Sequence, residues 1–184
     1  MIKTRAKRLL SIISMLFTLL FILSSCFNIT VSERIVSTEK AQNALYEALS
    51  CLDRPYNWGG NGPDAFDCSG LIIWSYQQVA DKILYYQTSN GLENDIQMDE
   101  LFSYNVTLIN SVNVRPGDIV FVTSKDDSVT HGGLFIKWID THTFLYVNAS
   151  SNHGAVAIDI WTLGEQIRGQ WFMGFGQLIE RTII

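Results

Sequence analysis

The sequence has 184 residues, 47% of them hydrophobic, which is enough for one domain with a buried core. Its 13 basic and 18 acidic residues give a net charge of −5. This acidic balance argues against a nucleic-acid partner, because phosphate contacts need clustered Lys and Arg.

The first 25 residues have the pattern of an export signal. Four basic residues stand within the first eight positions, and an uncharged apolar run follows from Leu9 to Leu23. The run leads into Leu23-Ser24-Ser25-Cys26, which resembles a bacterial lipobox, where the cysteine is lipidated and becomes the new N-terminus. The alternatives are an uncleaved membrane anchor and an ordinary secretory signal, but about 15 apolar residues are short for a membrane span. We predict a lipoprotein signal peptide at residues 1–25 and a lipidated tether at residues 26–36.

Cleavage before Cys26 would remove four basic residues and no acidic ones, which leaves a net charge of −9. Anionic lipid headgroups would repel such a chain, so its link to a membrane would be the lipid on Cys26. We therefore expect an exported protein that is lipid-anchored to the cell envelope, at an outer membrane, a periplasmic face or the cell surface.

Helices are predicted in the first half of the remaining chain. Ser37 or Thr38 can cap a helix that continues to about Leu52, with apolar residues at three- and four-residue steps. A loop rich in Gly and Pro then extends to Asp67, and a second helix is expected from Cys68 to about residue 82. The segment from residue 83 to residue 113 has a mixed pattern and yields no prediction.

Strands are predicted in the second half, where short apolar runs alternate with turn residues. The expected strands are residues 118–123, 132–139, 143–149, 155–160 and 170–179. Helices followed by strands predict an α+β domain, in which N-terminal helices pack on a C-terminal antiparallel sheet of about five to six strands.

Two cysteines, Cys51 and Cys68, remain once Cys26 is assigned to the lipid. They could pair as a disulfide in an exported protein, or Cys51 could be a small buried apolar residue beside a reactive Cys68. Cys68 opens the second predicted helix, where unpaired N–H groups and the helix dipole favour an anion and lower the pKa of a thiol. A cysteine at a helix start is nevertheless more often structural than catalytic, so a nucleophile would also need a base.

The candidates for this base are His131, His142 and His153. His142 and His153 fall in polar turns and are interpreted as solvated residues, whereas His131 begins an apolar strand. A hairpin between two predicted strands would place His131 opposite Asn148 on the same face of the sheet. Asn148 could then hold the second ring nitrogen, as in a Cys–His–Asn triad, or it could bond to its own turn at the end of the strand.

Five segments of the chain form a pattern when taken together. They are Tyr56-Asn57-Trp58-Gly59-Gly60, Phe66-Asp67-Cys68-Ser69-Gly70-Leu71, Arg115-Pro116-Gly117-Asp118-Ile119-Val120-Phe121, His131-Gly132-Gly133-Leu134 and Val147-Asn148-Ala149-Ser150. This pattern resembles the NlpC/p60 family of bacterial cell-wall peptidases over roughly residues 38–180. The resemblance implies a papain-like fold, with the cysteine on the helical half and the histidine on the sheet. It also implies hydrolysis of amide bonds in peptidoglycan stem peptides, often between the γ-carboxyl of D-glutamate and a diamino acid.

The resemblance further implies roles for individual residues. Cys68 becomes the nucleophile and His131 the base, while Asn148 takes the third polar place, where many members have histidine. The catalytic domain would be residues 37–184.

Three further positions of the resemblance concern the substrate. Tyr56 matches a tyrosine near the oxyanion, and Asp67 and Ser69 match positions that help hold the free amine of the substrate. The expected partners are peptidoglycan stem peptides or muropeptides and, through the N-terminal lipid, a membrane. We expect a monomer with no metal, cofactor or nucleic acid.

The chain also departs from the family pattern. The segment from Leu84 to Ser89 lacks the Pro and Arg that many members carry there, and Gly132 follows His131 where Val or Ala is usual. The loop from Lys137 to His142 is longer than the usual glycine turn. Two alternatives therefore stay open: an inactive wall-binding or scaffold lipoprotein of the same fold, and a thiol acyltransferase that acts on lipids.

Overall fold

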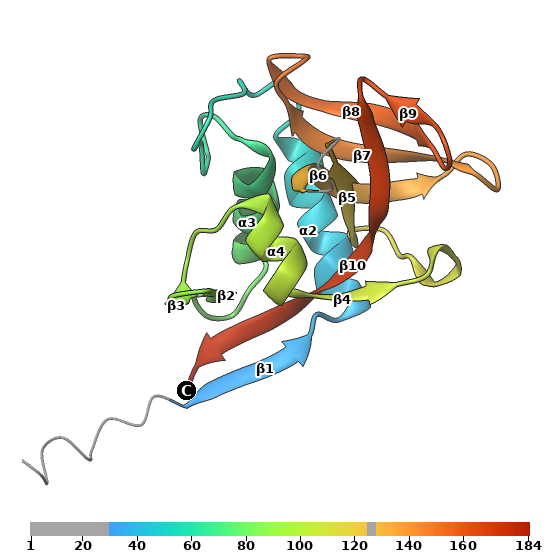
Figure 1. Ribbon diagram of the computed structural model, residues 1–184. Coiled ribbons are helices and arrows are strands. Elements are labelled where there is room, and N and C mark those ends of the chain that lie inside the picture. The colour runs from blue at the N-terminus through green and yellow to red at the C-terminus, as the bar shows by residue number, and fades with distance from the viewer. Residues whose placement is uncertain (1–29, 125–127) are drawn as a thin grey trace, which may run out of the picture. The chain divides into compact units, whose positions relative to one another are not determined.

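The computed structural model describes residues 30–124 and 128–184, and residues 32–183 form the unit that carries the candidate site (Figure 1). The predicted signal peptide and Cys26 lie outside the described residues. Across the two described ranges, no helix is both long enough and apolar enough to cross a membrane.

Three helices cover one side of the sheet (Figure 1). Helix α2 (Thr38–Ser50) begins as predicted, because the Ser37 side chain caps it by accepting a hydrogen bond from the N–H of Lys40. Helix α3 (Cys68–Gln78) begins at the predicted residue and ends about one turn earlier than expected. Helix α4 (Met98–Tyr104) lies in the segment that gave no prediction, since it has only seven residues and no side-chain cap.

All five predicted strands are present, with ends that differ by a few residues. They are β5 (Ile119–Thr123), β6 (Val129–Trp138), β7 (Thr143–Ser150), β8 (Ala155–Thr162) and β10 (Gln170–Ile183). The sheet has eight strands rather than five to six, because three short strands add to the long β10: β1 (Val31–Ile35), β4 (Val106–Ile109) and β9 (Gln166–Ile167). Strands β2 (Tyr86–Thr88) and β3 (Gly91–Glu93) form a separate pair.

Strand β1 changes the interpretation of the expected tether at residues 26–36. Residues 31–35 lie beside β10 in the sheet, and two ion pairs link the strands. The Arg181 Nε donates to Glu33 at 2.7 Å, and the Arg34 Nε donates to Glu180 at 2.9 Å. Because Glu180 and Arg181 are buried, these partners on β1 satisfy charges that would otherwise be costly inside the protein. The last part of the expected tether is thus a strand of the sheet.

The strands bury apolar residues on both faces. In β5, Ile119 and Phe121 pack against the helices, while Val120 and Val122 point to the other face, as the two-residue period of a strand requires. That other face carries a largely aromatic cluster of Val120, Val122, Phe135, Phe144, Tyr146, Trp161 and Phe175. Strand β6 contacts all three helices. A residue at the start of β6 is therefore held by the sheet and lies close to the helical half.

The segment Arg115–Phe121 fastens the sheet to the helices. The Tyr76 hydroxyl of α3 donates to the backbone carbonyl of Gly117 at 2.7 Å, and the Asp118 carboxylate accepts from the backbone N–H of Arg115 at 2.8 Å. Burial raises the pKa of Tyr76, which keeps this hydroxyl protonated and able to donate. This part of the family pattern contributes to the fold.

Candidate active site

Cys68 is the first residue of α3, and the residue before it holds this end of the helix. The Asp67 carboxylate accepts hydrogen bonds from the backbone N–H of Gly70 at 2.8 Å and from that of Gly59 at 2.8 Å. It also accepts from the Ser69 hydroxyl at 3.1 Å. One buried carboxylate thus caps the helix and fastens the preceding loop to it.

The two glycine-containing segments around Cys68 pack against each other through their backbones. A Cβ on Gly70 would lie 2.0 Å from the carbonyl oxygen of Gly60, so any larger residue would push the loop away from the helix. The Gly60 carbonyl also accepts a hydrogen bond from the N–H of Asp67 at 2.8 Å. This close approach gives a physical reason for glycine at position 70, whereas a Cβ on Gly60 would lie 2.8 Å from the carbonyl oxygen of Asn57 within the loop itself.

The Cys68 thiol is free and only 8% exposed, with its Sγ 3.9 Å from the carbonyl oxygen of Thr130. Burial, followed by the negative charge of Asp67, raises its pKa to about 12. Backbone N–H groups at the helix start act in the opposite direction, as the sequence predicted, and so does the N–H of Gly132, but burial outweighs them. The expected lowering of the pKa was therefore wrong, because burial favours the protonated thiol.

Cys51 is also free and buried, at the C-terminal end of α2. The two cysteines do not form a disulfide, and Cys51 is the small buried residue that the sequence suggested.

His131 lies near the start of β6, and its Nε2 is 3.0 Å from Oδ1 of Asn148 on β7. The predicted register, which places His131 directly opposite Asn148, was wrong by two residues. In the structure Leu134 pairs with Val147. The turn is displaced because the Asp140 carboxylate accepts from two backbone N–H groups beyond it, and β6 has a bulge before Lys137. A shift of two residues leaves every side chain on the same face of the sheet. His131 and Asn148 are therefore diagonal neighbours instead of directly opposite, and they are still in contact.

A carboxylate behind Asn148 determines how this amide is turned. The Asn148 Nδ2 donates to Oδ2 of Asp159 at 3.1 Å, and Asp159 can only accept. The amide oxygen therefore faces His131, which must carry its proton on Nε2 and keep a lone pair on Nδ1. Burial lowers the pKa of His131, so the ring is neutral and able to accept a proton at neutral pH.

Two further side chains hold Asp159. Its Oδ1 accepts from Nε2 of His153 at 3.0 Å and lies 3.5 Å from Nη1 of Arg168. Burial raises the pKa of Asp159, but hydrogen bonds from His153 and Asn148 outweigh it and hold the pKa below its ordinary value. His153, interpreted from the sequence as a solvated turn residue, thus belongs to the network behind His131. His142 is exposed in the β6–β7 turn, as expected.

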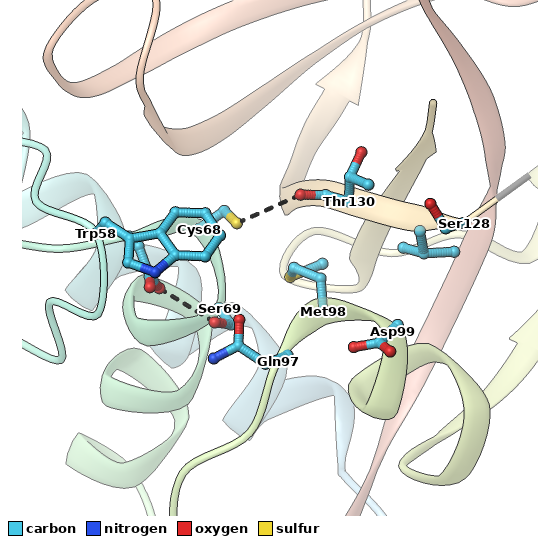
Figure 2. A pocket seen from close by; sticks show the side chains of 10 residues that line it. Trp58, Cys68, Ser69, Gln97, Met98, Asp99, Ser128 and Thr130 are labelled. Atoms are coloured by element: carbon cyan, nitrogen blue, oxygen red, sulfur yellow. Dashed lines mark hydrogen bonds between the residues drawn. The ribbon is translucent and has the colours of Figure 1, made fainter. Parts of the chain in front are cut away.

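Two cavities meet at Cys68 and share Trp58, Cys68 and Thr130. One has a volume of about 260 Å³ and extends toward the start of α4; we call it the α4 cavity (Figure 2). Its other lining residues are Asp67, Ser69, Gln97, Met98, Asp99, Ser128 and Val129. Among the described residues, the segment from Leu84 to Ser89 does not line it, so α4 forms this wall instead.

The second cavity has a volume of about 280 Å³ and extends toward the β7–β8 and β9–β10 turns; we call it the turn cavity. His131 and Tyr56 line it, together with Ser150, Ser151, Asn152, Arg168 and Gln170. Burial raises the pKa of Tyr56, with the negative charge of Asp67 acting in the same direction, so its hydroxyl stays a donor. Both members of a thiol–imidazole pair therefore face one open space.

The structure also explains why Gly132 follows His131, where Val or Ala is usual in the family pattern. A Cβ at this position would lie 2.4 Å from the carbonyl oxygen of Val120 and 2.5 Å from Cε of Met98. Met98, on α4, occupies the space that a side chain after His131 would need. Helix α4 thus packs closely on β6 beside the site.

The structure adds Asp159, His153 and Arg168 to the residues that the sequence singled out. Asp159 and Asn148 lie on adjacent strands, and the pairing of Asn148 with Ala157 brings them together. The same argument from alternating strand faces, applied to the hairpin of β7 and β8, could have found Asp159. Nothing in the sequence marked Arg168. In the described part of the chain, no group of three or more His, Cys, Asp or Glu residues could hold a metal ion.

A cysteine at a helix start that shares a cavity with a sheet-borne histidine defines the papain-like class of α+β fold. Comparison with known proteins agrees. The family model of the NlpC/P60 family matches residues 53–174. The chain therefore belongs to the NlpC/P60 family.

Individual relatives and structures fit this assignment. The "Probable endopeptidase p60" of Listeria grayi is 30% identical over 143 residues, which cover 77% of this chain and 24% of that protein. NlpC1 from Trichomonas vaginalis has a TM-score of 0.57 at 22% identity, over 80% of this chain and 47% of that one. An NLP/P60-family protein of Staphylococcus aureus, described as similar to lipoprotein, has a TM-score of 0.52 at 22% identity, over 80% and 44%. These structures confirm the fold, and the chain spans about a quarter of the length of the Listeria relative.

Proposed function

We propose that this protein is a cysteine endopeptidase that hydrolyses amide bonds in peptidoglycan stem peptides through Cys68, His131 and Asn148. The observation that carries the proposal is the 3.0 Å contact between His131 and Asn148, with the histidine in the same cavity as Cys68. It leaves Nδ1 as the basic nitrogen for the thiol. The bond we propose joins the γ-carboxyl of D-glutamate to a diamino acid, as in the resemblance described above.

The first half of the reaction forms a thioester. His131 takes the thiol proton on Nδ1, and the Cys68 sulfur attacks the carbonyl carbon of the scissile amide. Backbone N–H groups at the start of α3 and the Tyr56 hydroxyl stabilise the oxyanion. The imidazolium then protonates the leaving nitrogen, the C–N bond breaks, and the amine departs.

The second half returns the enzyme to its starting state. Water enters from the side that the amine has left, and His131 removes a proton from it as it attacks the thioester carbonyl. The C–S bond breaks, the carboxylic acid is released, and the proton on His131 returns to the Cys68 sulfur. Because burial raises the pKa of the Cys68 thiol, this proton transfer is part of each turnover.

The α4 cavity fits the acyl part of the substrate. Asp67 and Asp99 line it, and a negative wall favours a free amine such as the N-terminus of a stem peptide. The Asp67 carboxylate already accepts three hydrogen bonds, so we assign it mainly to positioning Ser69 and the helix start. Asp99 is exposed and is the freer of the two carboxylates.

We further propose that residues 1–25 are a lipoprotein signal peptide and that Cys26 carries the lipid of an exported, monomeric protein. The apolar run and the cysteine that follows it support this assignment. Mass spectrometry of the protein isolated from membranes should find a lipidated N-terminal Cys26, and a Cys26→Ala variant should lose the lipid. An unmodified cysteine in the isolated protein would exclude the anchor.

The proposed activity is tested by digesting purified peptidoglycan with the native protein and with a Cys68→Ala variant. We expect the native protein to release peptides whose masses identify a cut after the γ-carboxyl of D-glutamate. The Cys68→Ala variant should release none, and a His142→Ala variant should match the native protein. Equal release by Cys68→Ala would exclude Cys68 as nucleophile, and binding to the wall without release by the native protein would favour a scaffold.

A further inference from the structure

The two cavities that meet at Cys68 carry opposite charges. The described residues of the α4 cavity include two carboxylates, Asp67 and Asp99, and no cation. Among the described residues, those that line the turn cavity include one permanently charged side chain, Arg168, and no carboxylate, although the Asp159 carboxylate lies 3.5 Å from the Arg168 Nη1. A substrate that crosses Cys68 would therefore meet carboxylates at one end and a guanidinium at the other.

The position of His131 determines which end of the substrate lies in which cavity. His131 lines the turn cavity and not the α4 cavity. Under the proposed function this histidine protonates the leaving nitrogen, so the fragment that departs as an amine must occupy the turn cavity. The acyl fragment then lies in the α4 cavity, on the other side of Cys68.

Arg168 is anchored at the mouth of the turn cavity by one long ion pair. Its Nη1 lies 3.5 Å from Oδ1 of Asp159, an oxygen that already accepts from His153. The side chain is 45% exposed, and a guanidinium has five N–H donors, of which this long contact engages few. Asp159 thus orients Arg168 and leaves most of its donors for a ligand.

The backbone at Arg168 is also unusual. Its φ of 53° is in the left-handed region, which residues other than glycine, asparagine and aspartate enter at a cost. The next residue, Gly169, has a φ of 79°, so the two form the tight β9–β10 turn. The turn carries a strained arginine beside the glycine and directs it toward the cavity that holds His131.

We propose that the turn cavity is a carboxylate subsite, in which Arg168 binds a free carboxylate of the residue whose amine is released. This inference rests on the proposed function and narrows its substrate class. A guanidinium offers only donors, which match the two oxygens of a carboxylate, whereas a carboxamide presents an N–H₂ group to it. The protein should therefore prefer stem peptides whose diamino acid carries a free carboxyl over those in which this carboxyl is amidated.

The test compares two peptides that differ only in this group, a γ-D-glutamyl-diamino acid with a free carboxyl and the same peptide as its carboxamide. We expect the native protein to prefer the free acid by about tenfold or more in kcat/KM, mainly through KM, as for a charge-assisted hydrogen bond. In Arg168→Ala the preference should fall below about twofold, and Arg168→Lys should keep part of it. The matched control is Arg54→Ala, which removes an exposed arginine that lines neither cavity and should keep the full preference.

Two outcomes would overturn the subsite. One is a preference that survives in Arg168→Ala. The other is an equal loss of kcat on both peptides with a changed pH profile, which would mean that Arg168 acts only by positioning Asp159.

Binding of the released fragment separates this inference from the proposed function. Calorimetry with Cys68→Ala should show tighter binding of the free diamino acid than of its amide, whether or not the native protein hydrolyses either peptide. Tighter binding of the acid without hydrolysis would reject the endopeptidase and retain the subsite. Equal binding of the two compounds would reject the subsite, even if the native protein hydrolyses both peptides.

Discussion

The two halves of the site are held in place in different ways. On the helical side, Cys68 is positioned by residues within ten positions of it, through the three hydrogen bonds of Asp67 and the contact between Gly60 and Gly70. On the sheet side, His131 depends on a chain of contacts that passes through Asn148 to Asp159, on two further strands. The helical side is thus a local structure, whereas the sheet side requires the whole sheet to be folded.

This difference predicts different consequences of mutation. A change on the helical side should first affect the stability of the loop and helix, because the same bonds hold both. A change on the sheet side should first affect the protonation and orientation of His131, because the strands themselves are held by many other hydrogen bonds. The four predictions below test this comparison, from the largest expected effect to the smallest.

Replacing the base should have the largest effect. In His131→Ala, kcat for release of peptides from peptidoglycan should fall by at least about a thousandfold, because neither the thiol nor the leaving amine has a proton partner. The free energy of unfolding should fall by only about 1–2 kcal/mol, because the buried Asn148 loses the hydrogen-bond partner of its Oδ1 while the strands stay paired. Activity within about tenfold of native would show that another group acts as base.

Removing the helix cap should act mainly on stability. Asp67→Ala leaves the buried N–H of Gly70 and the part-buried N–H of Gly59 without an acceptor and should lower the free energy of unfolding by about 2 kcal/mol. Asp67→Asn should lose less, because asparagine also caps helices. Denaturant unfolding of the three proteins measures this, and a loss below about 0.5 kcal/mol in Asp67→Ala would contradict the role given to the cap.

Replacing Asp159 should act mainly on the histidine. Asp159→Asn can both donate and accept, so the Asn148 amide is no longer forced to face His131 with its oxygen. We expect kcat to fall about tenfold and stability to change by less than about 1 kcal/mol. Nitrogen chemical shifts of the His131 ring should show the proton on Nε2 in the native protein and a mixture of tautomers in the variant. His142→Ala is the control, and an unchanged tautomer would remove Asp159 from the positioning network.

The smallest effect concerns pH. Because the pKa of Cys68 rises from 9.0 to about 12 on folding, its alkylation by iodoacetamide should accelerate continuously from about pH 7 to beyond pH 9. The folded state keeps a proton that the unfolded state loses in this range, so the contribution of Cys68 to stability should fall between pH 9 and pH 12. Cys68→Ala should lack that part of the pH dependence. An alkylation rate that becomes constant near neutral pH would contradict this prediction and indicate a preformed thiolate–imidazolium pair.

The same comparison explains what could be predicted from the sequence. The cap, the cysteine and the glycine loop are close together in the chain, so α2, the loop and the start of α3 were predicted almost to the residue. The strands were found from their alternation, but β1 and β4 are short and depend on pairing with β10. Such strands have no pattern of their own, since their stability comes from their partner.

On the sheet side of the site, the sequence predicted only the residues within one hairpin, His131 and Asn148. Asn148 was found although the register was wrong, because an error of two residues preserves the face of a strand. Asp159 lies one strand further on, and Arg168 lies in a turn after a two-residue strand. Their places depend on tertiary packing, which a local pattern does not contain. The pKa of Cys68 was mispredicted for the same reason, since burial is a property of the folded chain.

Trp58, which lies where the two cavities meet, has a fluorescence that depends on what occupies the site. Trp58 is 76% exposed and lines both the α4 cavity and the turn cavity, next to Cys68. The indole of an exposed tryptophan emits at longer wavelength than one shielded from water, so a peptide lying across Cys68 would shift its fluorescence toward the blue. Trp58 is one of five tryptophans, so the part of the shift that a Trp58→Phe variant lacks reports occupancy, even where Cys68 has been replaced and no chemistry occurs.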